Sequence, residues 1–157
     1  MEKIGHFLDD SVAKLYKKLK TEGFDKQGAS SEIAKLLNIA KILRKASKNW
    51  DGGYVIGGLL GHGDSFVLRD PAGIRPAFFY KDDEVVVVAS ERPAIQTVFN
   101  VPMEAIQEIA PGHALIIKKS GALSHVKINM PSSRLSCSFE RIYCLLYTSD
   151  AADDRGC

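Results

Sequence analysis

The strongest constraint on the fold is the shortness of the links between the β-type segments in the second half of the sequence. From Trp50 to about residue 128, short apolar and β-branched runs alternate with tight turns at 61–64, 82–83 and 120–121. Parallel strands need a crossover of about a dozen residues or more, which links of this length cannot hold. The sequence therefore predicts hairpins and a mostly antiparallel sheet.

The individual strands follow from the same pattern of apolar runs and turns. The Gly-rich run at 54–60 is typical of a buried strand with close backbone neighbours. Ser90 is predicted to cap a short helix at 93–99, because proline is favoured in a first helical turn. Segment 103–109 fits either a strand or a short helix. The other predicted strands are 65–70, 77–80, 84–89, 113–119 and 123–128.

Residues 1–49 show helical rather than β-type periodicity. Apolar residues recur at three- and four-residue steps in two stretches, the first ending at Gly23 and the second starting near Ser30 or Ser31 as N-cap. The short link between them predicts an antiparallel helical hairpin. The fold class is therefore α+β. The two stripes are Ile4, Leu8, Val12, Leu15 and Leu19, and Ile33, Leu36, Leu37, Ala40 and Leu43.

Composition places the chain among ordinary globular proteins. Hydrophobic residues make up 45% and charged residues 25%, which excludes disordered, collagen-like and disulfide-scaffold classes. No run reaches the roughly 18–20 apolar residues that span a bilayer, and segment 1–7 lacks a signal-peptide core. A cytoplasmic location without membrane contact is the default expectation.

Charge is distributed unevenly along the chain. Residues 1–50 hold 11 Lys and Arg against 6 Asp and Glu, whereas the remaining residues hold 10 against 13. A basic half is compatible with nucleic-acid binding, but the lysines alternate with apolar helix positions. A solvated helix face without nucleic acid is the favoured interpretation.

Cysteine and histidine positions suggest little chemistry by themselves. The three cysteines, Cys137, Cys144 and Cys157, fit neither a disulfide framework nor a common metal knuckle. His62 lies between two glycines, and no nucleophile with an orienting acid is evident at a readable spacing. The interpretation favoured for His62 is a turn residue rather than a general base.

The segment 69–76 is the most specific in the chain. It holds two arginines, an aspartate and two prolines, which predicts a rigid loop with charge-assisted contacts. One interpretation is an anion site read by Arg75. The other, which the spacing favours, is structural, with Asp70 binding backbone amides or an arginine.

Five motifs follow one another in the second part of the chain. They are Trp-Asp-Gly-Gly-Tyr at 50–54, Gly-His-Gly at 61–63, Arg-Asp-Pro-x-Gly-Ile-Arg-Pro at 69–76, Val-Ala-Ser-Glu at 88–91 and Ile-x-Pro-Gly-x-Ala at 109–114. In order and spacing they resemble the class II glutamine amidotransferases, and most closely the branch that acts on phosphoribosyl pyrophosphate in purine synthesis. The resemblance covers about residues 50–143, and segment 136–143 resembles the junction that leads into a phosphoribosyltransferase domain.

The resemblance implies part of an αββα N-terminal-nucleophile hydrolase sandwich. In this family an N-terminal cysteine hydrolyses glutamine, and an Asn-Gly pair forms the oxyanion hole. The ammonia passes to a second domain, which uses magnesium with phosphoribosyl pyrophosphate. The resemblance also implies a homo-oligomer and, in some members, an iron–sulfur cluster, for which Cys137 is a weak candidate ligand.

No catalytic residue of the family can be placed on this sequence. Residue 2 is Glu2 rather than cysteine, and no Asn-Gly pair occurs. The resemblance therefore implies a glutaminase half-domain, inactive alone and needing the remainder of its own chain. Its expected parts are a helical hairpin at 1–49, a β-rich half at 50–130, a junction at 131–143 and a non-native tail at 144–157, which resembles a translated sequencing adapter.

The matched motifs are expected to support the glutaminase pocket. Arg69, Asp70, Gly73 and Arg75 would brace the loop beneath it. Ser90 and Glu91 would cap and anchor the helix that follows the long strand.

Two other functions remain open. Relatives that make asparagine or glucosamine phosphate share the 69–76 pattern, so the chain could be a half-domain of such an enzyme. Alternatively, it could be a non-catalytic module that binds partners through its basic helical hairpin. The junction segment favours the phosphoribosyl branch over the first of these.

Overall fold

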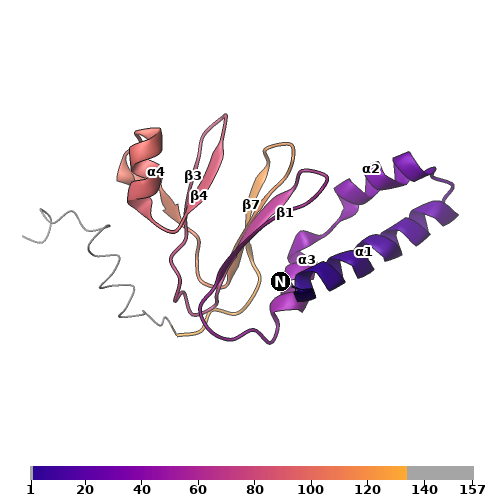
Figure 1. Cartoon of the computed structure of the whole chain (residues 1–157), viewed down its shortest axis with the longest axis horizontal. Helices are drawn as coiled ribbons and strands as arrows, with labels where there is room; N and C mark the ends of the chain where they lie inside the picture. The colour runs from indigo at the N-terminus through magenta and orange to yellow at the C-terminus, as the bar shows by residue number, and fades with distance from the viewer. Residues whose placement is uncertain (1, 134–157) are drawn as a thin grey trace, which may run out of the picture.

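The computed structural model describes residues 2–133 and places them in four layers. The first and third helices cover one face of a four-stranded sheet, and the second helix packs against the first (Figure 1). A three-stranded sheet packs on the other face, and a single helix lies outside this second sheet. The protein is thus α+β, with helices and antiparallel strands as predicted. The layer order is the αββα order that the resemblance implies.

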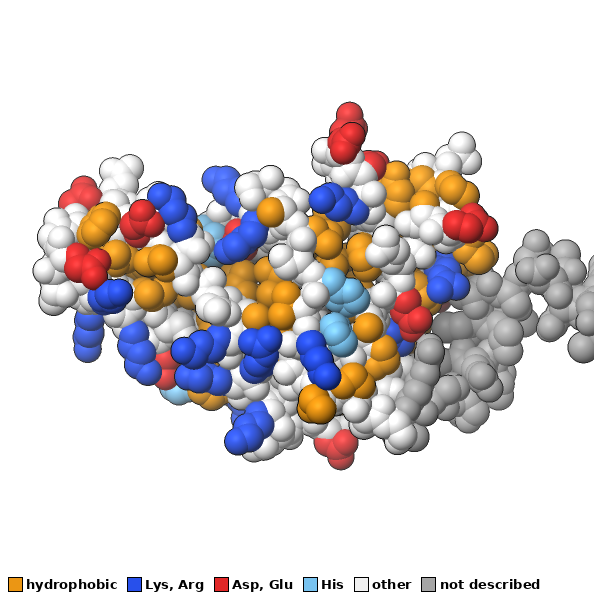
Figure 2. Space-filling model, turned by 180° about the vertical axis from the view of Figure 1, so that it is seen from behind, with side chains coloured by type: hydrophobic (Ala, Val, Ile, Leu, Met, Phe, Trp, Pro, Cys, Tyr) orange, Lys and Arg blue, Asp and Glu red, His pale blue; other side chains and the backbone are white. Residues whose placement is uncertain are grey.

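The helical layer consists of α1 (Glu2–Thr21), α2 (Lys26–Leu36) and α3 (Ile39–Ser47). α1 and α2 pack side by side as the predicted hairpin (Figure 1). Lys and Arg side chains form a band across this helical half of the molecule in Figure 2. The band is consistent with a solvated face, because the apolar stripes point inward.

The prediction of a single second helix was wrong. The backbone leaves the helical region at Leu37 (ψ 115°), and the Asn38 side chain accepts the amide of Lys41 at 2.9 Å, which starts α3 as a new helix. The N-cap of α2 is Asp25, whose carboxylate accepts the amide of Gly28 at 2.8 Å. Ser30 and Ser31, the predicted caps, lie inside α2.

The four-stranded sheet has the order β1-β2-β6-β7, with every pair antiparallel. Its strands are β1 (Val55–Leu59), β2 (Ser65–Arg69), β6 (His113–Ile117) and β7 (Leu123–Lys127). Both predicted hairpins are present. The β2–β6 pairing brings together segments far apart in sequence, which places the 69–76 loop beside the turn that precedes β6.

The three-stranded sheet has the order β4-β3-β5, from β3 (Phe78–Lys81), β4 (Val86–Ala89) and β5 (Gln107–Glu108). Segment 103–109 contains both predicted alternatives, a 3-10 turn at Met103–Ala105 and then β5. α4 (Arg92–Phe99) covers this sheet. Its N-cap is Glu91, without a side-chain capping bond. Ser90 therefore does not cap the helix, because the helix begins one residue later than that role requires.

Two apolar cores hold the layers together. The first joins the helices to the four-stranded sheet, and the second fills the space between the sheets. Successive strand residues serve different cores, because side chains alternate between faces. The buried members of the first core are Ile4, Ile39, Leu43, Ala46, Phe66, Leu68, Ala114, Ile116 and Ile128, and those of the second are Ala77, Phe79, Ile109 and Leu115.

β1 is an edge strand rather than the buried strand that its sequence predicted. Alternate residues are exposed, with Val55 at 37% and Leu59 at 79%. The register pairs Gly57 with Val67, so these residues share the face that looks toward the second sheet. Because that sheet has one strand fewer, it does not cover them.

The strand was predicted to have close backbone neighbours, but the close neighbour of its Gly58 is a side chain. A Cβ on Gly58 would lie 2.5 Å from the ring of Phe66, whose side chain fills the space above the glycine.

Within residues 2–133, no helix combines the length and the apolar character needed to cross a membrane.

The exposed inner face of β1 gives a first test. We expect the chain to bind a hydrophobic fluorescent dye, and Leu59→Lys to reduce the fluorescence, because a charge on this edge discourages apolar contacts. Val98→Lys is the control, since Val98 is similarly exposed (75%) but lies on α4. Equal effects of both substitutions, or no dye binding, would contradict the assignment of an open apolar edge.

Candidate functional site

The side chain of Arg69 is the centre of the 69–76 loop. It is 2% exposed, and its Nε donates to the carbonyl of Arg75 at 2.7 Å. Nη2 donates to the carbonyl of Gly73 at 3.2 Å, and Nη1 to that of Ile109 at 2.6 Å. Nη1 also lies 2.6 Å from the carboxylate of Glu108. One guanidinium thus ties the loop to β5 in the opposite sheet.

Asp70 fixes the same loop from the other side. Its side chain is fully buried, and its two oxygens accept the amides of Ile74 at 3.0 Å and Arg75 at 3.1 Å. Its own amide donates to the carbonyl of Tyr54, and its carbonyl accepts the amide of Gly112, both at 2.9 Å. The carboxylate therefore binds backbone amides, one of the two structural roles the sequence allowed.

Gly73 allows the loop to close over Arg69. Its φ is +65°, a left-handed conformation that side chains disfavour. A Cβ there would lie 2.8 Å from Cγ of Pro111 and 3.5 Å from Nη2 of Arg69. Glycine is therefore required at this position by both backbone conformation and space.

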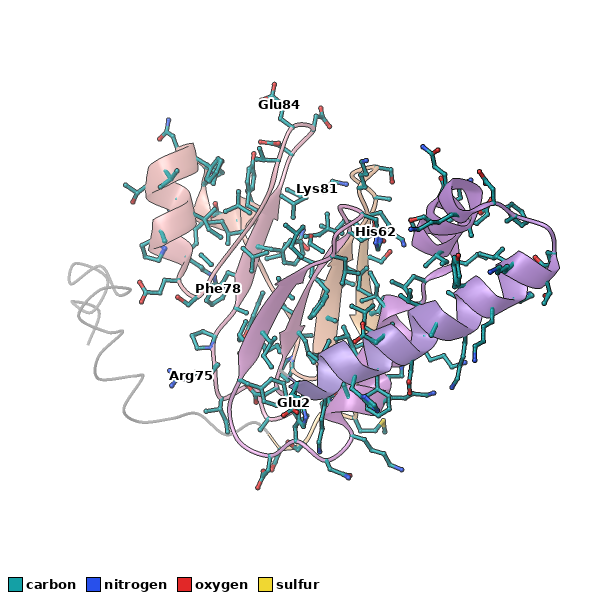
Figure 3. The ribbon with its side chains drawn as sticks, turned by 45° about the vertical axis from the view of Figure 1, so that its right-hand side comes forward. Glu2, His62, Arg75, Phe78, Lys81 and Glu84 are labelled. Atoms are coloured by element: carbon teal, nitrogen blue, oxygen red, sulfur yellow. The ribbon has the colours of Figure 1, made fainter. Side chains whose placement is uncertain are left out.

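A cavity of about 430 Å³ opens beside this braced loop. Arg69, Asp70 and Gly73 are not among its lining residues and support the loop from within, while the exposed side chain of Arg75 stands at its rim (Figure 3). The lining residues come from three of the sequence motifs and are Gly53, Tyr54, Val55, Arg75, Pro76, Ser90 and Glu91.

Tyr54 links the cavity to the first core. Its ring packs against that core and meets the ring of Trp50 edge-on, with centroids 5.2 Å apart. Burial, and then the nearby Asp70 carboxylate, raise the pKa of Tyr54. The phenol is therefore neutral in the physiological range and presents a hydroxyl rather than a charge.

The structure changes the roles expected of several site residues. Arg75 joins the brace through its backbone, while Ser90 and Glu91 line the cavity. Glu108, which partners Arg69, was not among the expected site residues, whereas Gly112, whose amide donates to the carbonyl of Asp70, belongs to the motif at 109–114. The only local signal for Glu108 was its place as a lone acid directly before the motif at 109–114.

A second polar cluster joins the two hairpin turns at the far end of the first sheet. Asp64 is 3% exposed and lies 2.6 Å from Nζ of Lys118, and its other oxygen accepts the amide of Lys119 at 2.9 Å. His62 Nε2 lies 3.0 Å from Asp64. Burial opposes ionisation of Asp64, but these contacts outweigh it and lower its pKa to about 2.

The remaining sequence predictions concern residues outside those described. Cys137, the junction at 136–143 and the tail at 144–157 all lie beyond residue 133. In residues 2–133, no group of three or more His, Cys, Asp or Glu side chains is placed to hold a metal ion.

Comparison with curated proteins identifies two relatives. No family model matches the chain. The amidophosphoribosyltransferase of Methanothermobacter thermautotrophicus is 30% identical over 115 residues, covering 73% of this chain and 23% of the relative. That of Archaeoglobus fulgidus is 33% identical over 129 residues, covering 78% and 27%. The chain thus spans about a quarter of the length of each relative.

Two solved structures share the fold. One is the glutamine phosphoribosylpyrophosphate amidotransferase of B. subtilis in complex with ADP and GMP, and the other is described as the allosteric regulatory enzyme of purine biosynthesis. Each has a TM-score of 0.54 and 24% identity, covering 83% of this chain and 29% of the solved one.

The layered α+β fold of this chain is thus shared with part of each of these two solved structures. Over the stretch that it spans, the sequence is similar to the amidophosphoribosyltransferases.

The buried carboxylate of the brace can be tested directly. Asp70→Ala leaves two partly buried amides without their carboxylate acceptor, so we expect the free energy of unfolding to fall by about 2–4 kcal/mol. Urea denaturation measures the loss. Asp83→Ala, on the exposed β3–β4 turn, is the control and should change stability by less than about 0.5 kcal/mol. An unchanged melting temperature for Asp70→Ala would show that the brace does not stabilise the fold.

The low pKa of Asp64 predicts a pH dependence. A carboxylate with a folded pKa of about 2 is ionised more readily than in the unfolded chain, where its pKa is about 3.9. It therefore stabilises the fold fully above about pH 4, and this contribution is lost as the pH falls toward 2. The stability difference between wild type and Asp64→Asn should shrink over that window in urea titrations, whereas the difference for the exposed Asp10→Asn should stay constant.

Proposed function

We propose that this chain forms the second half of the glutaminase domain of an amidophosphoribosyltransferase, and that the 430 Å³ cavity is part of its glutamine pocket. The observation that carries the proposal is the convergence of three motifs. Segments 50–54, 69–76 and 88–91 are separate in sequence, yet each contributes lining residues to this one cavity. A shared cavity explains why one chain carries all three motifs.

The reacting groups of the proposed glutaminase come from the rest of its domain. An N-terminal cysteine would attack the glutamine amide, and an Asn-Gly pair would stabilise the oxyanion. This chain's part is positional, since Arg69 and Asp70 fix the loop that carries Arg75, while Ser90 and Glu91 line the same cavity. The chain alone is accordingly inactive in this proposal.

The open edge of β1 supports a partner that completes the layers. Its exposed inner face and its unpaired backbone groups suit added strands from the remainder of the same polypeptide. In the whole enzyme, ammonia from glutamine would react with phosphoribosyl pyrophosphate held with magnesium. A homo-oligomer and a cluster liganded by Cys137 belong to the same proposal for that enzyme.

The alternatives receive less support. Both curated relatives are amidophosphoribosyltransferases, which favours that branch over enzymes making asparagine or glucosamine phosphate. The basic hairpin commits its apolar stripes to packing, with Ile4 in the core under the first sheet and Leu19, Ala29 and Ile33 between α1 and α2. Its lysines remain on the surface, so a separate binding role would depend on charge alone.

A chimera tests the proposed function. Residues 2–133 replace the matching segment of the Archaeoglobus fulgidus relative, and the rate of phosphoribosylamine formation is measured with glutamine and with ammonium as nitrogen source. We expect both to support the reaction, because the chimera regains a complete glutaminase domain. Arg75→Ala in the chimera should lower the glutamine-dependent rate by about tenfold or more and spare the ammonium-dependent one.

Lys81→Ala is the matched control for the chimera. Lys81 is an exposed cation at the opposite end of the same sheet from Arg75 (Figure 3). A chimera that folds and uses ammonium but not glutamine would refute the proposed role of this half-domain.

A further inference from the structure

A second cavity lies at the other end of the molecule from the proposed glutamine pocket. It measures about 580 Å³ and opens between α2 and the turns that join β1 to β2 and β6 to β7. Figure 3 shows His62, one of its lining residues, at the tip of the β1–β2 hairpin on the side of α2. It shares no lining residue with the first cavity, so its occupant would be a different molecule.

One face of α2 forms the helical wall of this cavity. Gln27, Ser30, Ser31 and Ala34 line it, and their spacing places them on a single helix face. Serine is a weak helix former that is favoured at the N-cap position rather than inside a helix. In α2 the N-cap position is occupied by Asp25. Within the described residues, no other side chain bonds the hydroxyls of Ser30 or Ser31. The helix thus presents two hydroxyls and an amide to the cavity without a structural need for them.

The opposite wall supplies positive charge. Lys118 and Lys119 line the cavity from the β6–β7 turn. Asp64 neutralises Lys118 at 2.6 Å, whereas Lys119 forms no ion pair in the part of the chain that the structure describes. The stem of Lys119 lies over Gly63, whose Cβ would come within 3.1 Å of it. The backbone bond to Asp64 and this contact position the Lys119 side chain before any ligand arrives.

A third lysine completes the charge excess. Lys35 lines the cavity from the end of α2, and its only described carboxylate partner is Glu32 at 3.2 Å. Such exposed pairs are weak, so an anion can compete for this ammonium. Lys118 and Lys35 thus pair with Asp64 and Glu32, and Lys119 supplies the positive charge that has no ion-pair partner within residues 2–133.

We propose that the cavity between α2 and the two hairpin turns binds the phosphate groups of a phosphorylated small molecule. Ammonium, hydroxyl and amide donors surrounding a site with excess positive charge match the several acceptor oxygens of a phosphate. The volume lies in the range of small-molecule pockets, about 300–1,000 Å³, and is larger than a lone phosphate needs.

Equilibrium dialysis with radiolabelled pyrophosphate tests the proposal on the full chain, and it works whatever the oligomeric state. At constant ionic strength, we expect saturable binding of one pyrophosphate per chain. Lys119→Gln should weaken it by about tenfold or more, and Ser31→Ala by a smaller factor, because a charge-assisted bond is stronger than a neutral one. Lys41→Gln, an exposed lysine on α3, should leave it unchanged. Circular dichroism confirms that each variant is folded.

Three results would overturn the proposal. The first is linear, non-saturable uptake of pyrophosphate. The second is equal weakening by Lys119→Gln and Lys41→Gln, which would indicate diffuse charge rather than a site. The third is displacement of pyrophosphate by single-stranded DNA, together with DNA binding that Lys119→Gln and Lys41→Gln weaken equally. That result would assign the surface to nucleic acid. Because the readout is binding, none of these results bears on the proposed glutaminase.

Discussion

The buried guanidinium of Arg69 is the interaction on which the rest of the structure depends. Its donors satisfy carbonyls in the 69–76 loop and next to β5, at the point where the chain passes from one sheet to the other. A buried charge is costly unless it is paired and fully bonded. Glu108 supplies the charge, and the loop supplies the carbonyls. Loop and sheets therefore form only together, which holds the cavity wall in a fixed position.

The unequal widths of the two sheets leave part of the first sheet uncovered within residues 2–133. Four strands face three, so the inner side of β1 stays open. At one end of the uncovered region, the braced loop and the start of α4 enclose the proposed glutamine pocket. At the other end of the first sheet, the helical layer reaches past the hairpin turns, and the lysine-lined cavity forms beneath α2.

Features that depend on neighbouring residues were predicted correctly from the sequence, whereas features that depend on distant partners were not. Both hairpins of the first sheet were confirmed, because a short turn fixes its own neighbours. β1 was expected to be buried, but its exposure depends on how many strands the opposite sheet has. The second helix was predicted as one piece because its apolar stripe continues, whereas Asn38 starts a new helix through a side-chain bond. Asp70 was anticipated as a loop brace. Glu108 was missed because its role comes from a residue 39 positions away.

The contact between Gly58 and Phe66 has a consequence for how this sheet can change. The ring occupies the volume that a side chain at position 58 would need. The two positions, paired across β1 and β2, therefore share a single space. A larger residue at one is compatible with the fold only if the other becomes smaller, so substitutions there are coupled. Either strand can carry the larger side chain of this pair, but the combined volume of the two side chains cannot increase.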